Sequence, residues 1–224
     1  MQAAAFDDAA RAALAAGARR VAEGGLVVGS AGNLSLRSGE RVLITPRGAL
    51  LEAIDPADCV EIAMEDGAVA ADHSAASQPS SEEALHRAIY ATTRSGAIVH
   101  THSRYATVLS TLIDELPAIH YTINAFGGPV RVARYECFGT DALASAVTEA
   151  MDGRSAALMA NHGRVVAGHD IEHAVAKAIQ LEWVASIHYH AIVAGTPSIL
   201  SQADLDAVRE RARELRHGAE VGAR

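Results

Sequence analysis

Apolar and polar positions in the first third of the chain predict one helix followed by short strands. Residues 6–23 carry apolar positions at helical spacing and end at Gly24 and Gly25, so they predict an amphipathic helix. The glycine-rich turn GSAG then leads into NLSLR, and the alternating run RVLIT (41–45) predicts the strand that pairs with it. CVEIA and GAVAA predict a further short hairpin around EDG.

The rest of the chain mixes helical and extended patterns. In QPSSEEALHRAIYATTR, Ser80 and Glu83 have the spacing of a capping box and predict a helix, which the apolar run GAIVHTH follows as a strand. The remaining predicted elements are a helix at about 104–113, a strand at 130–135, a helix from Thr140, the strands AALMAN and RVVAG, a helix at about 170–194 and an Arg-rich last helix. This order is that of an α/β protein without strict β-α-β alternation.

Length and composition predict a soluble globular protein. With 224 residues, 50% of them hydrophobic, the chain can build a core without disulfides. The Ala-rich N-terminus is interrupted by Asp7, Asp8 and Arg11, which is not the layout of a signal peptide. No run approaches the roughly 18 apolar residues of a membrane span, so we expect a cytoplasmic protein.

Charge and cysteine content exclude several kinds of partner. The net charge is −8 and no block of like charges occurs, so nucleic acid and anionic membranes are not expected partners, whereas a small anionic substrate needs only local donors. Cys59 and Cys137 lie far apart without CxxC spacing. They indicate a reducing compartment and ordinary core or half-buried side chains.

Three histidines could hold a metal ion. His100 and His102 are two apart in a predicted strand, so their imidazoles share one face about 7 Å apart along it. His162 follows the next-to-last strand in a turn, NHG, and could converge on them. Catalytic zinc sites use three protein ligands and one open position, and these three would suffice. The residues alone also fit a pair of polar strand histidines and a polar turn residue.

A second histidine group is a weaker candidate. His169 and His173 lie at the start of a predicted helix beside acidic residues, and His188 and His190 project from that helix some 200° apart. We expect these four to belong to a solvated helix face.

Two segments have the composition of an anion site. GSAGNLS offers small residues that allow backbone N–H groups to approach an anion, together with the Asn33 amide. Ser80 and Ser81 stand at a predicted helix N-terminus, where free N–H groups and the helix dipole favour phosphate. Plain helix capping explains the serines equally well.

Six motifs occur in a fixed order along the chain: GSAGNLSLR, LITPRG, PSSEEALH, IVHTHSRYAT, LPAIHY and NHG. In this order they resemble the class II aldolase/adducin family, most closely its L-fuculose-1-phosphate aldolase branch. The likeness extends from about residue 6 to residue 213. It implies one domain over residues 1–224, of the α/β class, with a central, mostly antiparallel sheet flanked by helices in three layers.

The resemblance also implies roles for individual residues. Those it makes metal ligands are His100, His102, His162 and Glu82, with Glu82 also the catalytic acid/base. Those it places around the substrate phosphate are Gly32, Asn33, Gly48, Ser80 and Ser81, with Arg47 beside them. Tyr121 matches the tyrosine that protonates the aldehyde oxygen in a neighbouring subunit's site, which implies a homotetramer with sites at subunit interfaces.

The implied activity is a zinc-dependent aldolase that reversibly cleaves a small ketose 1-phosphate into dihydroxyacetone phosphate and an aldehyde. Cleavage between C3 and C4 leaves an enediolate, whose charge a chelated Zn²⁺ stabilises. Mn²⁺, Co²⁺ and Fe²⁺ stay open as alternatives to zinc.

The chain departs from the aldolase branch at two positions. Arg47 replaces a small hydroxylic residue, and it could contact phosphate, bind a carboxylate or point to solvent. The branch also has a C-terminal tyrosine, whereas the last tyrosine here is Tyr189.

Three other functions remain open. A pentulose-5-phosphate 4-epimerase and a metal-dependent decarboxylase belong to the same family. A non-catalytic adducin-like module is the alternative of a different class, although such modules lose metal ligands that this chain retains.

Overall fold

A single eight-stranded sheet organises the described part of the chain. The structure, a computed structural model, describes residues 6–70 and 77–222. The strands are β1 (Asn33–Ser38), β2 (Arg41–Ile44), β3 (Val60–Ala63), β4 (Ala97–Thr101), β5 (Glu115–Leu116), β6 (Val130–Ala133), β7 (Ala156–Met159) and β8 (Gly163–Gly168). Their order in the sheet is β3-β2-β1-β4-β8-β7-β6-β5, and every neighbouring pair is antiparallel except β6 with β7. The predicted α/β class with a mostly antiparallel sheet is confirmed.

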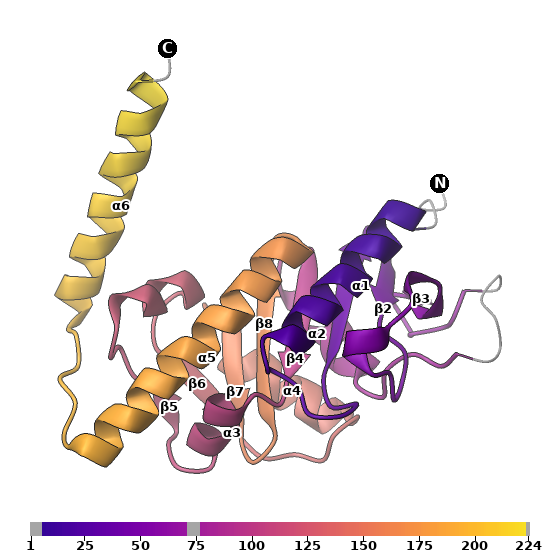
Figure 1. Ribbon diagram of the computed structural model, residues 1–224, viewed down its shortest axis with the longest axis horizontal. Coiled ribbons are helices and arrows are strands. Elements are labelled where there is room, and N and C mark those ends of the chain that lie inside the picture. Colours follow the sequence, from indigo (N-terminus) through magenta and orange to yellow (C-terminus); the bar gives the residue numbers. More distant parts are fainter. Residues whose placement is uncertain (1–5, 71–76, 223–224) are drawn as a thin grey trace.

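Helices cover both faces of this sheet (Figure 1). They are α1 (Asp8–Glu23), α2 (Glu83–Thr92), α3 (Arg104–Ser110), α4 (Asp141–Ala150), α5 (Ile171–Ala194) and α6 (Gln202–Gly222). The helix α5 packs against α1 and α3 on one face, and α2 packs against α4 on the other. The last helix, α6, projects away from this body (Figure 1). No helix within the described ranges is long and apolar enough to cross a membrane.

Alternation along β4 divides the core in two and places the first histidine. Val99 packs into the cluster with α1, α3 and α5, whereas Ile98 packs into the cluster with α2 and α4. Because residues two apart in a strand share a face, His100 follows Ile98 onto the α2 side. The strand ends at Thr101, so His102 lies just beyond the sheet.

The hairpin of β1 and β2 is confirmed, and several predicted boundaries are wrong. The third helix ends at Ser110 rather than near residue 113, and the sixth strand ends at Ala133, two residues early. The second hairpin is only partly formed, because β3 faces GAVA through an isolated bridge from Ile62 to Val69; the final Ala71 lies outside the described residues.

The expected capping box at α2 is wrong. This helix begins at Glu83, one residue after Glu82, and Glu82 makes no side-chain cap bond. Ser80 Oγ accepts the N–H of Glu82, while the Glu83 carboxylate pairs with Arg87 one turn later. The serine is held in the preceding loop, where its N–H bonds to Thr45 O, so it cannot occupy the cap position.

Candidate active site

The strand β4 delivers two imidazoles to one point. His100 is fully buried and pairs in register with Asn33 of β1. Its Nδ1 lies 2.8 Å from the carbonyl oxygen of Arg164, so Nδ1 is the donor and Nε2 keeps its lone pair. The Nε2 atoms of His100 and His102 approach to 3.0 Å. Both nitrogens therefore face a common point.

The NHG turn between β7 and β8 brings the third imidazole to this point. Asn161 turns the chain with a φ of 55°, the left-handed region that asparagine tolerates better than most residues. A Cβ at Gly163 would lie 2.4 Å from Thr101 O, so this close passage of β8 along β4 requires glycine. The ring of His162 then stands 4.7 Å from that of His102.

Glu82 closes the cluster from the start of α2. Its Oε2 lies 3.0 Å from His100 Nε2, and its Oε1 lies 3.4 Å from His162 Nε2. One ligand atom from each of these residues and from His102 falls within 4.8 Å of the others. Among the described residues, buried Oε1 has no hydrogen-bond partner. Three imidazole nitrogens and an unsatisfied carboxylate oxygen are a donor set that fits a divalent metal ion.

Mutual electrostatics set the protonation of the cluster. Burial alone would raise the pKa of the Glu82 carboxyl, but His100, His162 and a hydrogen bond from Asn33 hold that pKa well below its usual value. Burial likewise lowers the pKa of His100, yet the charge and hydrogen bond of Glu82 outweigh it and raise this pKa. Burial and the charge of His100 lower the pKa of His102 to about 4 and also lower that of His162. His102 and His162 are thus neutral at neutral pH, and binding of a metal by His100 needs Nε2 without a proton.

A buried polar chain supports Glu82 from behind. Asn33 Nδ2 donates to Glu82 Oε2 at 3.0 Å, and Asn33 Oδ1 lies 2.6 Å from His86 Nε2. His86 Nδ1 in turn lies 2.7 Å from Ser35 Oγ, which lies 2.8 Å from the Tyr90 hydroxyl. His86 was not predicted from the sequence, although its place one helical turn after Glu82 indicates that the two side chains share a helix face.

Helix α3 is fixed directly after the histidine strand. The Glu182 carboxylate on α5 accepts the Ser103 hydroxyl at 2.6 Å and the backbone N–H groups of Tyr105 and Ala106 at 2.7 and 3.1 Å. These are free N–H groups at the start of α3, which a carboxylate satisfies well. The segment that carries His102 is therefore anchored at both ends.

Two loops bring together the residues that were predicted to surround an anion. The N–H of Arg47 donates to Gln78 O at 2.9 Å, and that of Ser80 donates to Thr45 O at 3.2 Å. Gly32 closes the third side with a φ of 108°, where a Cβ would lie 3.0 Å from the carbonyl oxygen of His100. The expected cradle residues therefore lie on adjoining loops.

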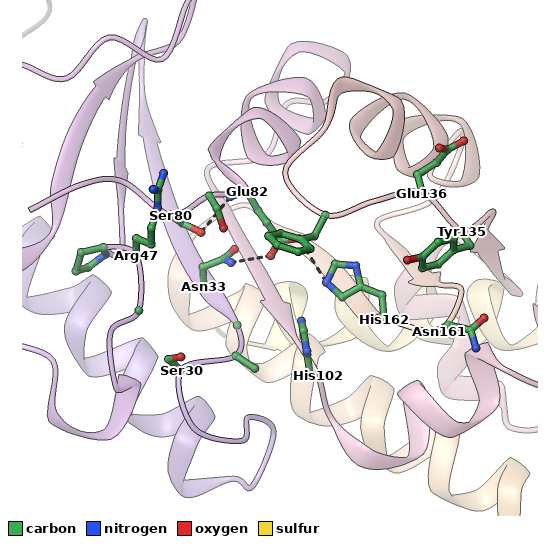
Figure 2. A pocket seen from close by; sticks show the side chains of 16 residues that line it. Ser30, Asn33, Arg47, Ser80, Glu82, His102, Tyr135, Glu136, Asn161 and His162 are labelled. Carbon is green, nitrogen blue, oxygen red and sulfur yellow. Dashed lines mark hydrogen bonds and ion pairs between the residues drawn. The ribbon is translucent and has the colours of Figure 1, made fainter.

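The expected cradle residues line one cleft of about 360 Å³ together with Glu82, His102 and His162, while His100 is fully buried. Figure 2 shows Asn33, Arg47 and Ser80 on one side of the cluster and Tyr135, Glu136 and Asn161 on the other. Four residues of the cleft wall were not predicted from the sequence: Tyr135, Glu136, Phe138 and Asn161. The predicted strand at 130–135 included Tyr135. Because β6 ends at Ala133, Tyr135 and Phe138 lie beyond the strand and can border the cleft.

Not every candidate reaches the cleft. Within the described chain, Tyr121 does not line it; this residue starts a 3₁₀ helix, Tyr121–Phe126, and is 52% exposed. The solvated face expected for the second histidine group is wrong for His188, which is buried, while His169 and His190 are exposed. Of the cysteines, Cys59 is buried as expected but Cys137 is exposed.

The chain is similar to known proteins of one family. The family described as Class II Aldolase and Adducin N-terminal domain matches residues 12–189. A 5-methylthioribulose-1-phosphate/5-deoxyribulose-1-phosphate aldolase of Rhodospirillum rubrum is 35% identical over 91% of this chain and 91% of its own length. An L-fuculose phosphate aldolase of Escherichia coli K12 is 34% identical, covering 84% and 86%. A solved L-fuculose 1-phosphate aldolase superposes with a TM-score of 0.87 at 33% identity, covering 93% of this chain and 98% of the other.

The family match spans the elements from α1 to α5, and the cluster of three histidines and one glutamate lies within that span. The relatives match over most of both chains, so the likeness extends to the whole fold rather than to one motif. This chain belongs to the class II aldolase/adducin family.

Proposed function

We propose that this class II aldolase cleaves a small ketose 1-phosphate, of the L-fuculose-1-phosphate or 5-methylthioribulose-1-phosphate type, into dihydroxyacetone phosphate and an aldehyde. The observation that carries the proposal is the position of the three histidines and Glu82, at the centre of a cleft with an anion cradle on one side and aromatic side chains on the other. The relatives named above act on sugar phosphates, which supports this substrate class.

Four residues are proposed to hold a divalent ion, for which we favour Zn²⁺. They are His100, His102, His162 and Glu82. When bound, the ion would supply Lewis-acid stabilisation of the negative charge that develops on the substrate oxygens. Neutral imidazoles leave the ion its full positive charge, and the hydrogen bond from His100 to the Arg164 carbonyl fixes the tautomer that ligation needs.

Glu82 is proposed to move the proton at C3 of dihydroxyacetone phosphate. In the cleavage direction the C3–C4 bond breaks, the C4 hydroxyl passes its proton to water by way of the Tyr121 hydroxyl proposed to reach the site from a neighbouring subunit, and C3 receives a proton from Glu82, which is left ionised. In condensation the carboxylate removes that proton. Glu82 lines the cleft and has one buried oxygen without a hydrogen-bond partner among the described residues, which suits this task.

Arg47 is proposed to bind the substrate phosphate. Its guanidinium makes no hydrogen bond or ion pair within the described residues, it is exposed, and it borders the cleft beside Ser80 and Gly48. A guanidinium can give two parallel hydrogen bonds to a phosphate, whereas the small residue usual in the aldolase branch gives at most one.

The Arg47→Ala variant should raise KM for the ketose phosphate by about 10- to 100-fold and leave kcat within a few-fold. A charge-assisted hydrogen bond contributes roughly 1.5–3 kcal/mol, and this binding is the same in the ground and transition states. Steady-state kinetics check it, with Arg209→Ala on α6 as the control. An unchanged KM would mean that Arg47 points to solvent.

The opposite wall is proposed to receive the aldehyde portion of the substrate. Tyr135 and Phe138 border the cleft, and each is 65% exposed. Exposed aromatic rings lower the free energy of an apolar group that packs on them. A deoxy or methylthio end group therefore suits this wall better than a hydroxymethyl group.

We further propose that the chain forms a homotetramer with fourfold symmetry. The exposed aromatic surface consists of Tyr121, His120 and Trp183, whose rings contact one another in sequence. A groove of about 650 Å³ connects Trp183 with His102 of the metal cluster and with exposed Val28. Apolar exposed surface next to a site is a feature of subunit interfaces. Ile123 and Phe126, which follow Tyr121 along the chain, are buried in the chain's own core and add nothing to this surface.

Mixing two inactive variants tests this assembly. Tyr121→Phe and Glu82→Gln subunits should each be nearly inactive, and co-expression should restore activity, because some sites then combine a native Glu82 with a neighbour's native Tyr121. Light scattering should give the mass of four chains. A monomer with intact activity, or mixtures without recovery, would contradict the proposal.

A substrate panel tests the activity itself. Ketose 1-phosphates with deoxy, methylthio and hydroxymethyl ends should release dihydroxyacetone phosphate, the first two with the higher kcat/KM. Pentulose 5-phosphates and hydroxylated aromatic acids enter the same panel as substrates of an epimerase and of a decarboxylase. Epimerisation or carbon dioxide release, without formation of dihydroxyacetone phosphate, would replace the aldolase proposal.

A further inference from the structure

The hydrogen bonds of the buried polar chain behind Glu82 can run in only one direction from donor to acceptor. An ionised carboxylate only accepts hydrogen bonds, so the Asn33 group facing Glu82 must be the amide nitrogen. The Asn33 oxygen then faces His86 Nε2 at 2.6 Å, and an oxygen acceptor requires a proton on that nitrogen. The direction of the first bond therefore determines the tautomer of His86.

The same requirement sets the direction of the remaining hydrogen bonds, from His86 through Ser35 to Tyr90. With its proton on Nε2, a neutral imidazole offers Nδ1 as an acceptor, and the Ser35 hydroxyl 2.7 Å away must donate to it. The Tyr90 hydroxyl, 2.8 Å from Ser35 Oγ, is then the donor to Ser35. Burial lowers the pKa of His86 to about 3, so the ring is neutral as this direction requires.

Burial makes the arrangement rigid. Ser35, His86 and Tyr90 are fully buried, and Asn33 and Glu82 are each 5% exposed. Water does not compete for these groups, so reversing one hydrogen bond would leave a buried donor or acceptor unpaired. If the Asn33 amide turned over, its oxygen would face the Glu82 carboxylate, and two acceptors would oppose each other.

We propose that His86 is a positioning residue that locks the Asn33 amide as a donor and thereby fixes the Glu82 carboxylate against the three histidines. Asn33 borders the cleft and belongs to the anion cradle. His86 therefore couples the orientation of the Glu82 carboxylate to that of the Asn33 amide, the proposed phosphate contact. The link to catalysis rests on the proposed reaction, whereas the link to metal retention rests only on the proposed ligand set.

Two amide variants separate this role from plain core packing. In His86→Gln the amide nitrogen reaches the position of Nε2 and keeps the bond to Asn33. In His86→Asn the shorter amide reaches only the position of Nδ1 and keeps the bond to Ser35. Both variants retain a polar group in the buried chain. They differ in whether that group bonds to Asn33 or to Ser35.

Metal loss to a chelator and steady-state kinetics are the readouts. His86→Gln should keep metal affinity and kcat within a few-fold of the unsubstituted protein. His86→Asn should lose 10- to 100-fold in metal affinity and in kcat, the range usual for residues that orient metal ligands. Tyr90→Phe should change both by only a few-fold, since it leaves the bond from His86 to Asn33 intact. Equal performance of the Gln and Asn variants, or a better Asn variant, would overturn the proposal.

If either variant fails to fold, the tautomer of His86 can be measured on the unsubstituted protein. Nitrogen NMR of histidine-labelled protein at neutral pH should show a neutral His86 with its proton on Nε2, assigned through its hydrogen-bond couplings. A proton on Nδ1 would overturn the proposal. If no substrate of the panel is cleaved while metal loss and tautomer follow expectation, the proposed reaction fails and the positioning role stands.

Discussion

The Glu82→Gln variant is expected to fold, to hold its metal ion and to turn over roughly 10²- to 10⁴-fold more slowly than the unsubstituted enzyme. Glutamine has nearly the size of glutamate and its amide can remain beside Asn33, so the local fold survives. The glutamine amide cannot take up or release a proton at neutral pH, so the variant has no group to transfer the proton at C3. Metal analysis, circular dichroism and kcat together test the three parts of this expectation.

The matched control is the next residue. Glu83→Gln changes an identical side chain one position later, where the carboxylate pairs with Arg87 on the surface of α2 rather than entering the cleft. An exposed or half-exposed ion pair contributes about 1 kcal/mol or less, so this variant should keep most of its activity. An inactive Glu83→Gln together with an active Glu82→Gln would reverse the assignment.

Replacing any one of His100, His102 and His162 by alanine is expected to remove the metal ion and, with it, the activity. The unsubstituted protein should hold about one divalent ion per chain, because the four donor atoms converge on a single point. Loss of one imidazole removes one of the four converging donor atoms, so the remaining site should release its ion during purification. Elemental analysis of each purified variant measures the effect.

Exposed His169, at the start of α5, provides the control for this series. His169→Ala should keep both metal and activity, because its side chain stacks on His173 and is not a member of the cluster. Full metal occupancy in all three cluster variants would refute the ligand assignment.

Local periodicity was sufficient for the elements that carry the histidines. The alternation in GAIVHTH predicts that His100 and His102 share a face, and the NHG turn between apolar strands offers a third imidazole as a candidate. Convergence itself depends on β8 lying beside β4, a pairing of residues more than sixty positions apart. Sequence pattern alone left that open, and the family resemblance supplied it.

Other features depend on contacts that no local pattern encodes. Ser80 has the sequence of a helix cap, but its backbone bond to Thr45 holds it in a loop, and the helix begins later. His86 gains its place only because β1 turns Asn33 and Ser35 toward α2. Tyr135 lines the cleft because the sixth strand ends early. In each case a tertiary contact overrides or completes the local preference.

Hydrogen exchange at C3 of dihydroxyacetone phosphate tests the central claim most directly, since it needs no knowledge of the aldehyde. In deuterated water, the metal-loaded protein should replace one of the two C3 hydrogens stereospecifically, as proton NMR can follow. Chelation should abolish the exchange, added Zn²⁺ should restore it, and Glu82→Gln should slow it by the same factor as turnover. Absence of exchange in the metal-loaded protein, or exchange that persists in Glu82→Gln, would contradict the account.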